Sequence, residues 1–411
     1  MSYRIVIAPS GFKESLSAAQ VAESIAEGVR RVIPDADIDL IPLVDGGEGT
    51  AEALALAGGG RLVPCTATGP VGRPVSTHFA LLGENGPGSG SLSGRDPGPG
   101  RASGRAPGPV TAVVEMAAVA GLSLVPADRR DPGSTTTYGV GELIRAALDL
   151  GARRVLVGCG DSGTSDGGAG ALRALGARLT DRHGRELPPG GAALGELDHV
   201  DTSGLDRRLA DTELLVACNP FNVLCGAHGV ARVFGPQKGA TPAGVEVLSA
   251  ALERWAAVLT RDLSPRIDLR TAPGTGASGG LGAGLAAVGA RLLPRFDVLL
   301  DRLDLDARLA RADLVITAEG ALDHQTVRGK IPAEVASRAH AAGVPVFVLA
   351  GTIGPGAHLV RAIGVDAYSA ILPAPMSLPE AIEGSREILA DATERSLRIV
   401  ELGTRLAARA A

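Results

Sequence analysis

The stretch Tyr3-Arg4-Ile5-Val6-Ile7-Ala8 decides the fold. Its apolar run predicts a buried strand, and Ser17-Ala18-Ala19-Gln20 has the pattern of a capping box that opens a helix. Pro34 ends this helix, and residues 38–43 form a second strand-like run. A strand, a helix and a strand in this order predict a parallel sheet, with functional loops at the carboxyl ends of its strands.

The same alternation recurs near the other end of the chain. Residues 314–317 and 344–349 are apolar runs separated by a helical pattern at 332–341, and a long helix is predicted from Ser377. The centre holds three more strand-like runs and two helical patterns, at residues 110–115, 155–159, 214–218, 139–150 and 245–259. We therefore predict an α/β fold in which both chain ends build one parallel-sheet domain and the centre builds another.

Length and composition agree with two folded domains. The chain has 411 residues, which is long for one hydrophobic core, with 45% hydrophobic and 21% charged residues. We place the discontinuous domain at residues 1–75 plus 288–411 and the central domain at 76–287. Residues 83–109 stand apart, because 18 of these 27 are Gly, Pro or Ser. Such a segment buries little apolar surface, which predicts a flexible surface insertion; a functional lid is the alternative.

Composition also excludes several classes of protein. The 45 acidic residues outnumber the 40 basic ones, so the net charge of -5 offers no field for nucleic acid. No run of 18 apolar residues and no signal peptide is present, which argues against a membrane protein. The four cysteines form no CxxC pair, and this usage predicts a reducing compartment, the cytoplasm.

Five glycine-rich loops carry the candidate chemistry, and most of them follow a strand-like run. Glycine lets backbone N–H groups approach an anion, while carboxylates hold Mg²⁺ or accept a hydroxyl proton; phosphoryl transfer needs both. The first loop, residues 8–15, brings Lys13 near a helix start, where a phosphate is favoured. The second, Asp45-Gly46-Gly47-Glu48-Gly49, has two acids that either coordinate Mg²⁺ or cap a helix.

The third loop is the densest. Residues 158–170 contain six glycines and five hydroxyl or acidic side chains, which predicts a cradle for phosphate or carboxylate with Asp166 as general base. The fourth, residues 273–282, contains a GxGxxG match. A dinucleotide site would need a strong strand before that match, and residues 266–270 are too polar for one. The context of the match therefore argues against hydride transfer.

The fifth loop, residues 317–326, carries Glu319 and Asp323 as metal or hydroxyl contacts, and Lys330 follows as a phosphate contact. It is no Walker A loop, because His324 stands where the first glycine would be and Ile331 where the Ser or Thr would be. A separate glycine-bounded turn, residues 234–239, bears Lys238 as a phosphate contact or as a surface lysine.

Together these segments resemble the bacterial glycerate kinases that use ATP. The resemblance covers nearly the whole chain and rests on Phe12-Lys13-Glu14-Ser15-Leu16-Ser17, residues 45–49, Thr135-Thr136-Thr137-Tyr138-Gly139, Asp166-Gly167-Gly168-Ala169-Gly170, residues 234–239 and 279–284, and Gln325-Thr326 with Gly329-Lys330. It implies two α/β domains, the one built from both ends being flavodoxin-like. It also implies MgATP as donor and glycerate as acceptor, with 2-phosphoglycerate favoured over 3-phosphoglycerate as product.

Departures from the family pattern fall in the same loops. Ala321 stands where the family usually has an arginine, and Asn219 stands where it usually has an aspartate. Since a guanidinium grips a carboxylate with two hydrogen bonds, the loss of the arginine keeps open another small hydroxy acid or a polyol as acceptor. A non-catalytic ligand-binding homologue is the alternative of a different class.

We therefore expect roles for the following residues. The catalytic candidates are Asp166, Lys13, Asp45 and Lys238. The candidates for substrate or nucleotide binding are Ser15, Gly46, Gly47, Ser162, Thr164, Gly167, Gly168, Gly276, Gly279, Gly280, Asp323 and Lys330. The candidates for holding a metal ion are Asp45, Glu48 and Glu319. The expected partners are ATP, Mg²⁺ and a glycerate-like hydroxy acid, with a homodimer open as an assembly.

Overall fold

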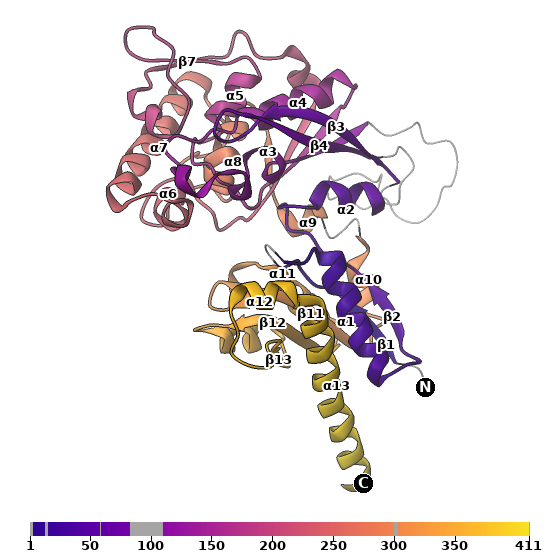
Figure 1. Ribbon diagram of the computed structural model, residues 1–411. Coiled ribbons are helices and arrows are strands. Elements are labelled where there is room, and N and C mark those ends of the chain that lie inside the picture. Colours follow the sequence, from indigo (N-terminus) through magenta and orange to yellow (C-terminus); the bar gives the residue numbers. More distant parts are fainter. Residues whose placement is uncertain (1–2, 13–14, 58, 83–109, 300–302, 411) are drawn as a thin grey trace, which may run out of the picture. The chain divides into compact units, whose positions relative to one another are not determined.

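The computed structural model describes residues 3–12, 15–57, 59–82, 110–299 and 303–410 (Figure 1). The chain divides into two compact units. Unit 1 consists of Met1–Asp45 and Leu303–Ala411, and unit 2 consists of Gly46–Arg302. The predicted insertion at 83–109 and the predicted catalytic residue Lys13 lie outside the described residues.

Unit 1 is built on a parallel sheet of five strands in the order β13-β12-β11-β1-β2. The strands are β1 (Arg4–Ile7), β2 (Asp37–Leu40), β11 (Leu314–Leu322), β12 (Val346–Ile353) and β13 (Ala367–Ala370). Numbered along the chain, this is the flavodoxin-like order 2-1-3-4-5, in which ligands bind where the strand order reverses. The predicted α/β class and the flavodoxin-like sheet are confirmed, and the switch point lies between β1 and β11.

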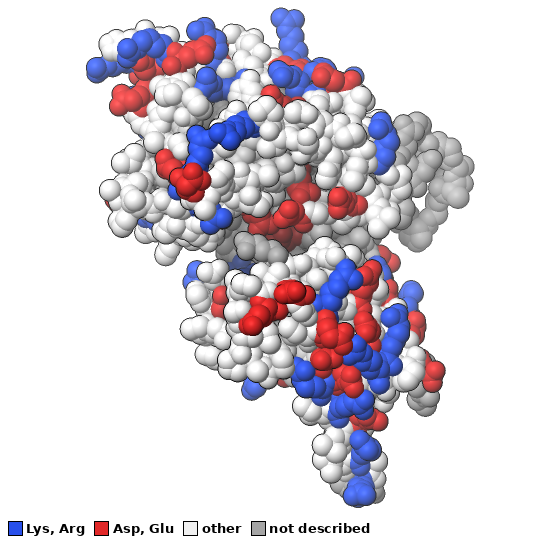
Figure 2. Space-filling model, viewed as in Figure 1, with Lys and Arg blue, Asp and Glu red and all other residues white. Residues whose placement is uncertain are grey.

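Helices cover this sheet. They are α1 (Ala18–Val32), α10 (Leu305–Leu309), α11 (Ile331–Ala341), α12 (Leu378–Glu383) and α13 (Ser385–Ala410). The predicted capping box at Ser17 starts α1, whose apolar face shares a core with β1, β11 and α13. Arg31 on α1 bonds Glu387 at 2.9 Å and Asp391 at 2.7 Å on α13. Figure 2 shows side chains of both signs interspersed over these two helices.

Unit 2 contains a mixed sheet in the order β10-β9-β6-β5-β4-β3. Its strands are β3 (Arg61–Thr68), β4 (Pro74–Leu82), β5 (Thr111–Glu115), β6 (Arg154–Gly158), β9 (Glu213–Cys218) and β10 (Arg291–Pro294). Strands β5, β6, β9 and β10 are parallel, so their carboxyl ends share one edge; β3 and β4 form an antiparallel hairpin beside them. A separate pair joins β7 (Arg178–Thr180) to β8 (His199–Asp201).

The helices of unit 2 lie on both faces of its sheet and in a cluster beyond it. They are α2 (Thr50–Ala57), α3 (Ala117–Ala120), α4 (Tyr138–Asp149), α5 (Ala169–Ala174), α6 (Val230–Phe234), α7 (Pro242–Leu263), α8 (Ala277–Ala287) and α9 (Arg295–Leu299). Apolar residues of α2 and α9 pack with one face of the sheet, and those of α4 and α8 pack with the other. Helix α7 forms a further core around Trp255, which is fully buried.

The unit boundaries differ from those expected, which were near residues 75 and 288. Residues 46–75 belong to unit 2, because β3 pairs with β4 and α2 packs on β4 and β5. Residues 288–302 also belong there, because β10 pairs with β9. In addition, the fourth glycine-rich loop continues into a helix, since α8 begins at Ala277. None of the described helices is long and apolar enough to cross a membrane.

Candidate active site

Asp166 is the centre of the glycine-rich loop between β6 and α5. Its side chain is fully buried. Its carboxylate accepts hydrogen bonds from the N–H groups of Thr137 (2.8 Å), Gly168 (3.1 Å) and Gly170 (3.1 Å), and from the Thr137 hydroxyl (2.9 Å). Burial raises the pKa of Asp166, and these donors oppose the rise. Asp166 thereby fixes its own loop against the start of α4.

This geometry does not suit the predicted role of Asp166 as general base. A base must come within about 2.6–3.2 Å of the hydroxyl that it deprotonates. The Asp166 oxygens instead meet four protein donors, and the side chain has no exposed surface. The contacts favour a positioning role, in which the carboxylate shapes a loop whose other groups meet the ligand.

Lys238 projects into the same loop from the short helix η5 (Pro236–Lys238). It is 2% exposed, and its Nζ donates to the Ser162 hydroxyl and to the Thr164 carbonyl, both at 2.7 Å. Burial lowers the pKa of the Lys238 ammonium to about 7, and the nearby Asp166 carboxylate opposes this shift. An ammonium has three N–H donors, so these two bonds leave one donor for an incoming anion.

Two buried hydroxyls on this loop and one at the start of α8 have no hydrogen-bond partners among the described residues. They belong to Thr164 and Ser165, whose side chains have no exposed surface, and to Ser278, which is 9% exposed and lies beside the Cys159 thiol. Buried polar groups normally have partners, and a cluster of exceptions needs an explanation. A bound oxyanion supplies one, because its oxygens accept from hydroxyls and from an ammonium alike.

The start of α8 closes the cradle with left-handed backbone. Ser278, Gly279 and Gly280 have φ values of 51°, 72° and 92°. A Cβ on Gly279 would lie 2.0 Å from the Thr164 carbonyl oxygen, so only glycine fits there. Ser278 is strained in this region, a cost of order 1–3 kcal/mol that typically marks functional sites. We call Ser162, Thr164, Ser165, Lys238 and residues 278–280 the anion cradle.

The second predicted loop lies at the same sheet edge. A Cβ on Gly160 would lie 2.5 Å from the Gly47 Cα, so the two loops touch backbone to backbone. Glu115, at the carboxyl end of β5, accepts from the N–H groups of Gly49 (2.8 Å) and Ala51 (2.9 Å) and so anchors the start of α2. Burial raises the pKa of Glu115 to about 7, while these two donors oppose the rise.

Unit 1 carries its own polar cluster at the switch point of its sheet. Glu319, near the end of β11, is 5% exposed; its carboxylate accepts from the Thr326 hydroxyl (2.6 Å) and pairs with Lys330 (3.1 Å). Lys330 also lies 3.4 Å from Asp323. Burial raises the pKa of Glu319, and the charge of Lys330 opposes the rise. Beside this cluster, Ser10 donates through its N–H and its hydroxyl to the Ala318 carbonyl, at 2.9 and 2.8 Å.

These contacts qualify the predictions made for unit 1. Both oxygens of Glu319 already have partners, which does not suit the predicted metal role. Lys330 is paired with two carboxylates, so it offers an incoming phosphate less charge than a lone lysine would. Ser15 keeps a buried hydroxyl that has no partner among the described residues, as a ligand contact would.

Comparison with known proteins identifies the family of this chain. Residues 5–401 match the model of the glycerate kinase family. The glycerate kinase of Bacillus subtilis (strain 168) is 43% identical over 405 residues, with 98% of each chain covered. The chain belongs to the glycerate kinase family. Glycerate 2-kinase of Escherichia coli (strain K12) is 39% identical over 403 residues, covering 98% of this chain and 99% of that one.

A solved structure of a family member has the same fold. It is the crystal structure of a protein assigned as glycerate kinase 2 from Salmonella typhimurium LT2, with a TM-score of 0.73 and 41% identity. The match covers 98% of this chain and 100% of the other. The resemblance to glycerate kinases drawn from the sequence motifs is confirmed.

Most of the predicted binding residues of unit 2 come together in this structure. Thr164, Gly167, Gly279 and Lys238 meet directly, because the Gly167 N–H donates to the Gly279 carbonyl at 2.9 Å. Glu48 is exposed, on the neighbouring loop whose Gly47 backbone touches Gly160. The sequence reasoning missed Glu115, Ser165 and Ser278. Ser278 could have been noticed as the one hydroxyl in the run Ala277-Ser278-Gly279-Gly280. Glu115 follows an apolar strand-like run, and nothing in that local pattern marks it as a loop contact.

Proposed function

We propose that this chain transfers the γ-phosphoryl group of ATP to the C2 hydroxyl of glycerate, giving 2-phosphoglycerate and ADP. In this reaction the hydroxyl oxygen bonds to the γ-phosphorus, the bond to the bridging oxygen of ATP breaks, and the hydroxyl proton is released. The anion cradle is the observation that carries the proposal, because it joins a buried cation to three hydroxyls without partners among the described residues. The choice of the C2 hydroxyl as the site of phosphorylation is supported by the E. coli relative, which is named glycerate 2-kinase.

The cradle suits phosphoryl transfer because that reaction depends on positioning and on charge stabilisation. Lys238 stabilises negative charge from a buried position, where an ion pair is stronger than in water. Its lowered pKa couples to binding, since an anion beside it favours the protonated form. Asp166 holds the cradle loop in shape, and Glu115 holds the neighbouring loop at residues 46–49.

Mg²⁺ has no preformed cage here: the described residues contain no group of three or more His, Cys, Asp or Glu that could hold it. Mg²⁺ sites in kinases use one or two carboxylates plus the phosphates of the nucleotide, so a cage is not required. Asp45 and Glu48, the acids of the 45–49 loop, are the proposed contacts. When bound, the ion would neutralise charge on the phosphates.

Ala321 bears on the choice of acceptor, because the family resemblance implies an arginine at this position. A cation is nevertheless present there, because Lys330 Nζ donates to the Ala321 carbonyl at 2.9 Å. Lys330 is already paired with Glu319 and Asp323, so glycerate as the acceptor is supported by the glycerate kinase relatives and not by this lysine. Another small hydroxy acid is the second candidate.

The test is phosphorus and carbon NMR of the product formed from ATP, Mg²⁺ and glycerate, alongside an ATP-consumption screen over hydroxy acids and polyols. We expect 2-phosphoglycerate as the main product. Turnover of another acceptor without glycerate turnover would move the assignment to that acceptor. Binding of ATP with no turnover of any acceptor would favour a ligand-binding homologue.

We further place the reaction in the cytoplasm, where ATP is abundant; all four cysteines are free thiols, as a reducing compartment allows. A homodimer stays a prediction, which sedimentation equilibrium would test.

A further inference from the structure

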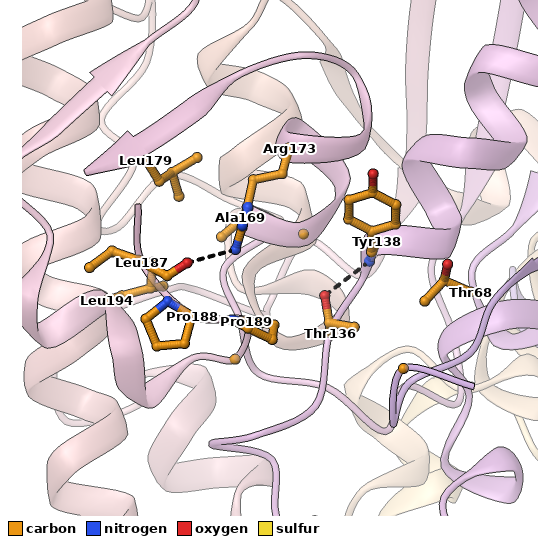
Figure 3. Close-up of a pocket in the computed structure, with 13 residues that line it drawn as sticks. Thr68, Thr136, Tyr138, Ala169, Arg173, Leu179, Leu187, Pro188, Pro189 and Leu194 are labelled. Carbon is orange, nitrogen blue, oxygen red and sulfur yellow. Dashed lines mark hydrogen bonds between the residues drawn. The ribbon is translucent and has the colours of Figure 1, made fainter. Parts of the chain in front are cut away.

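Unit 2 contains a half-open, mainly apolar cavity outside the anion cradle. Its volume is about 280 Å³. It lies between the β3–β4 hairpin, the starts of α4 and α5, and residues 187–190 (Figure 3). Leu187, Pro188 and Leu194 contribute apolar wall, while Tyr138 and Arg173 contribute an aromatic ring and a cation.

The cavity shares a wall with the loop that forms the anion cradle. Gly170 lines the cavity, and its N–H donates to Asp166 at 3.1 Å. A Cβ on Gly170 would lie 2.2 Å from the Thr136 hydroxyl oxygen and 2.6 Å from the Tyr138 nitrogen, so this wall is closely packed. Residues 162–170 therefore border an anion cradle at one end and an apolar cavity at the other.

The chemistry of the lining selects the occupant. A small hydroxy acid is charged and polar throughout, and it gains nothing from leucine and proline walls. A purine base has two flat apolar faces and a polar edge, which suit proline, tyrosine and guanidinium surfaces. Arg173 is held in place for such contact, because its Nη1 donates to the Leu187 carbonyl at 2.9 Å (Figure 3).

We propose that this cavity holds the adenine base of ATP, with the phosphates leading along residues 162–170 to the anion cradle. The inference rests on the proposed function in one respect, that ATP is the phosphoryl donor. It adds a base-binding site whose residues, Tyr138, Arg173, Leu187 and Leu194, lie outside the glycine-rich loops predicted to bind phosphates.

Photolabelling tests the site without any turnover. The unmodified chain is irradiated with 2-azido-ATP, and the labelled peptides are identified by mass spectrometry. We expect label on residues 187–194 or on Tyr138, suppressed by excess ATP and unaffected by glycerate. Label confined to unit 1, or no label that ATP suppresses, overturns the proposal. Label in the cavity without phosphoglycerate formation would instead keep the site and refute the kinase assignment.

Enlarging the cavity gives a second test. Leu194→Ala removes three side-chain carbons from its wall, so we expect the variant to bind N6-benzyl-ATP at least tenfold better, relative to ATP, than the unmodified chain does. The matched control is Leu259→Ala, because Leu259 is buried in the same core as Leu194 but does not line the cavity. Calorimetric titration measures both affinities. An unchanged ratio in a folded Leu194→Ala overturns the proposal, and if that variant does not fold the photolabelling decides.

Discussion

Replacing Asp166 with asparagine separates a positioning role from a catalytic one. The carboxylate offers two acceptor oxygens to Thr137, Gly168 and Gly170. An asparagine offers one oxygen and an NH₂ group that cannot accept. If its oxygen stays toward Thr137 and Gly170, the NH₂ faces the Gly168 N–H, and a buried donor loses its partner.

The size of the effect follows from these contacts. A buried N–H left without a partner costs about 1–3 kcal/mol, and the remaining bonds lose their charge-assisted strength. Part of this loss is offset because asparagine avoids burying a charge, a cost that the raised pKa of Asp166 reflects. We expect a net destabilisation of about 2–4 kcal/mol, or a Tm lower by about 4–10 °C.

The protein carries a suitable reporter. Trp255 is its single tryptophan, and its indole N–H donates to the Gly167 carbonyl at 2.8 Å, one residue from Asp166. Urea and thermal unfolding followed by tryptophan fluorescence therefore report on this loop and its core. The matched control is Asp211→Asn, an exposed aspartate in the same unit, whose unfolding curve should not shift.

Turnover must be measured on the same samples. The positioning role predicts that Asp166→Asn loses stability and activity together, and that glycerate kinase activity partly recovers under stabilising conditions. A variant that unfolds like the unmodified protein, yet turns over orders of magnitude more slowly, would refute this reasoning and restore Asp166 as the base.

Three further predictions concern the cradle and its support. Lys238→Met should lower kcat by about 10²–10³-fold and weaken ATP binding in calorimetric titration, because it removes the buried cation; near-normal kcat would exclude Lys238 from the mechanism. Gly279→Ala should abolish activity and lower Tm, because the new Cβ would clash with the Thr164 carbonyl oxygen. The control is Gly289→Ala: Gly289 also has a left-handed backbone, but a Cβ there would meet no other atom, so Tm should fall only slightly. Burial raises the pKa of Glu115 from 4.5 to about 7, so between these pH values the folded state holds a proton that the unfolded state has lost. The free energy of unfolding should therefore fall as pH rises through this window, by about 3 kcal/mol at most. Urea unfolding of Glu115→Gln should lack this pH dependence, and an identical pH dependence in the variant would show that Glu115 is not its source.

Much of the fold could be read from local sequence pattern. The apolar runs at residues 3–8, 314–317 and 344–349 predicted strands of one sheet, and β1, β11 and β12 lie in it side by side. The hairpin β3–β4 escaped prediction because β3 is an edge strand, half exposed and interrupted by Pro64, so it lacks the apolar run of a buried strand.

The sequence by itself determined where the chemistry gathers: glycine-rich loops after parallel strands, with lysines and acids but without a Walker A loop. Strand periodicity and glycine content are local properties, so a single sequence displays them. Only the tertiary structure decided what each group does. Thr137 and Asp166 lie 29 residues apart in the chain, and Lys238 and Ser162 lie 76 apart, yet each pair is hydrogen-bonded. Those contacts anchor the loop through Asp166 and bury Lys238, for which the sequence left a phosphate contact and a surface lysine open, because burial and partners are set by packing between segments distant in sequence.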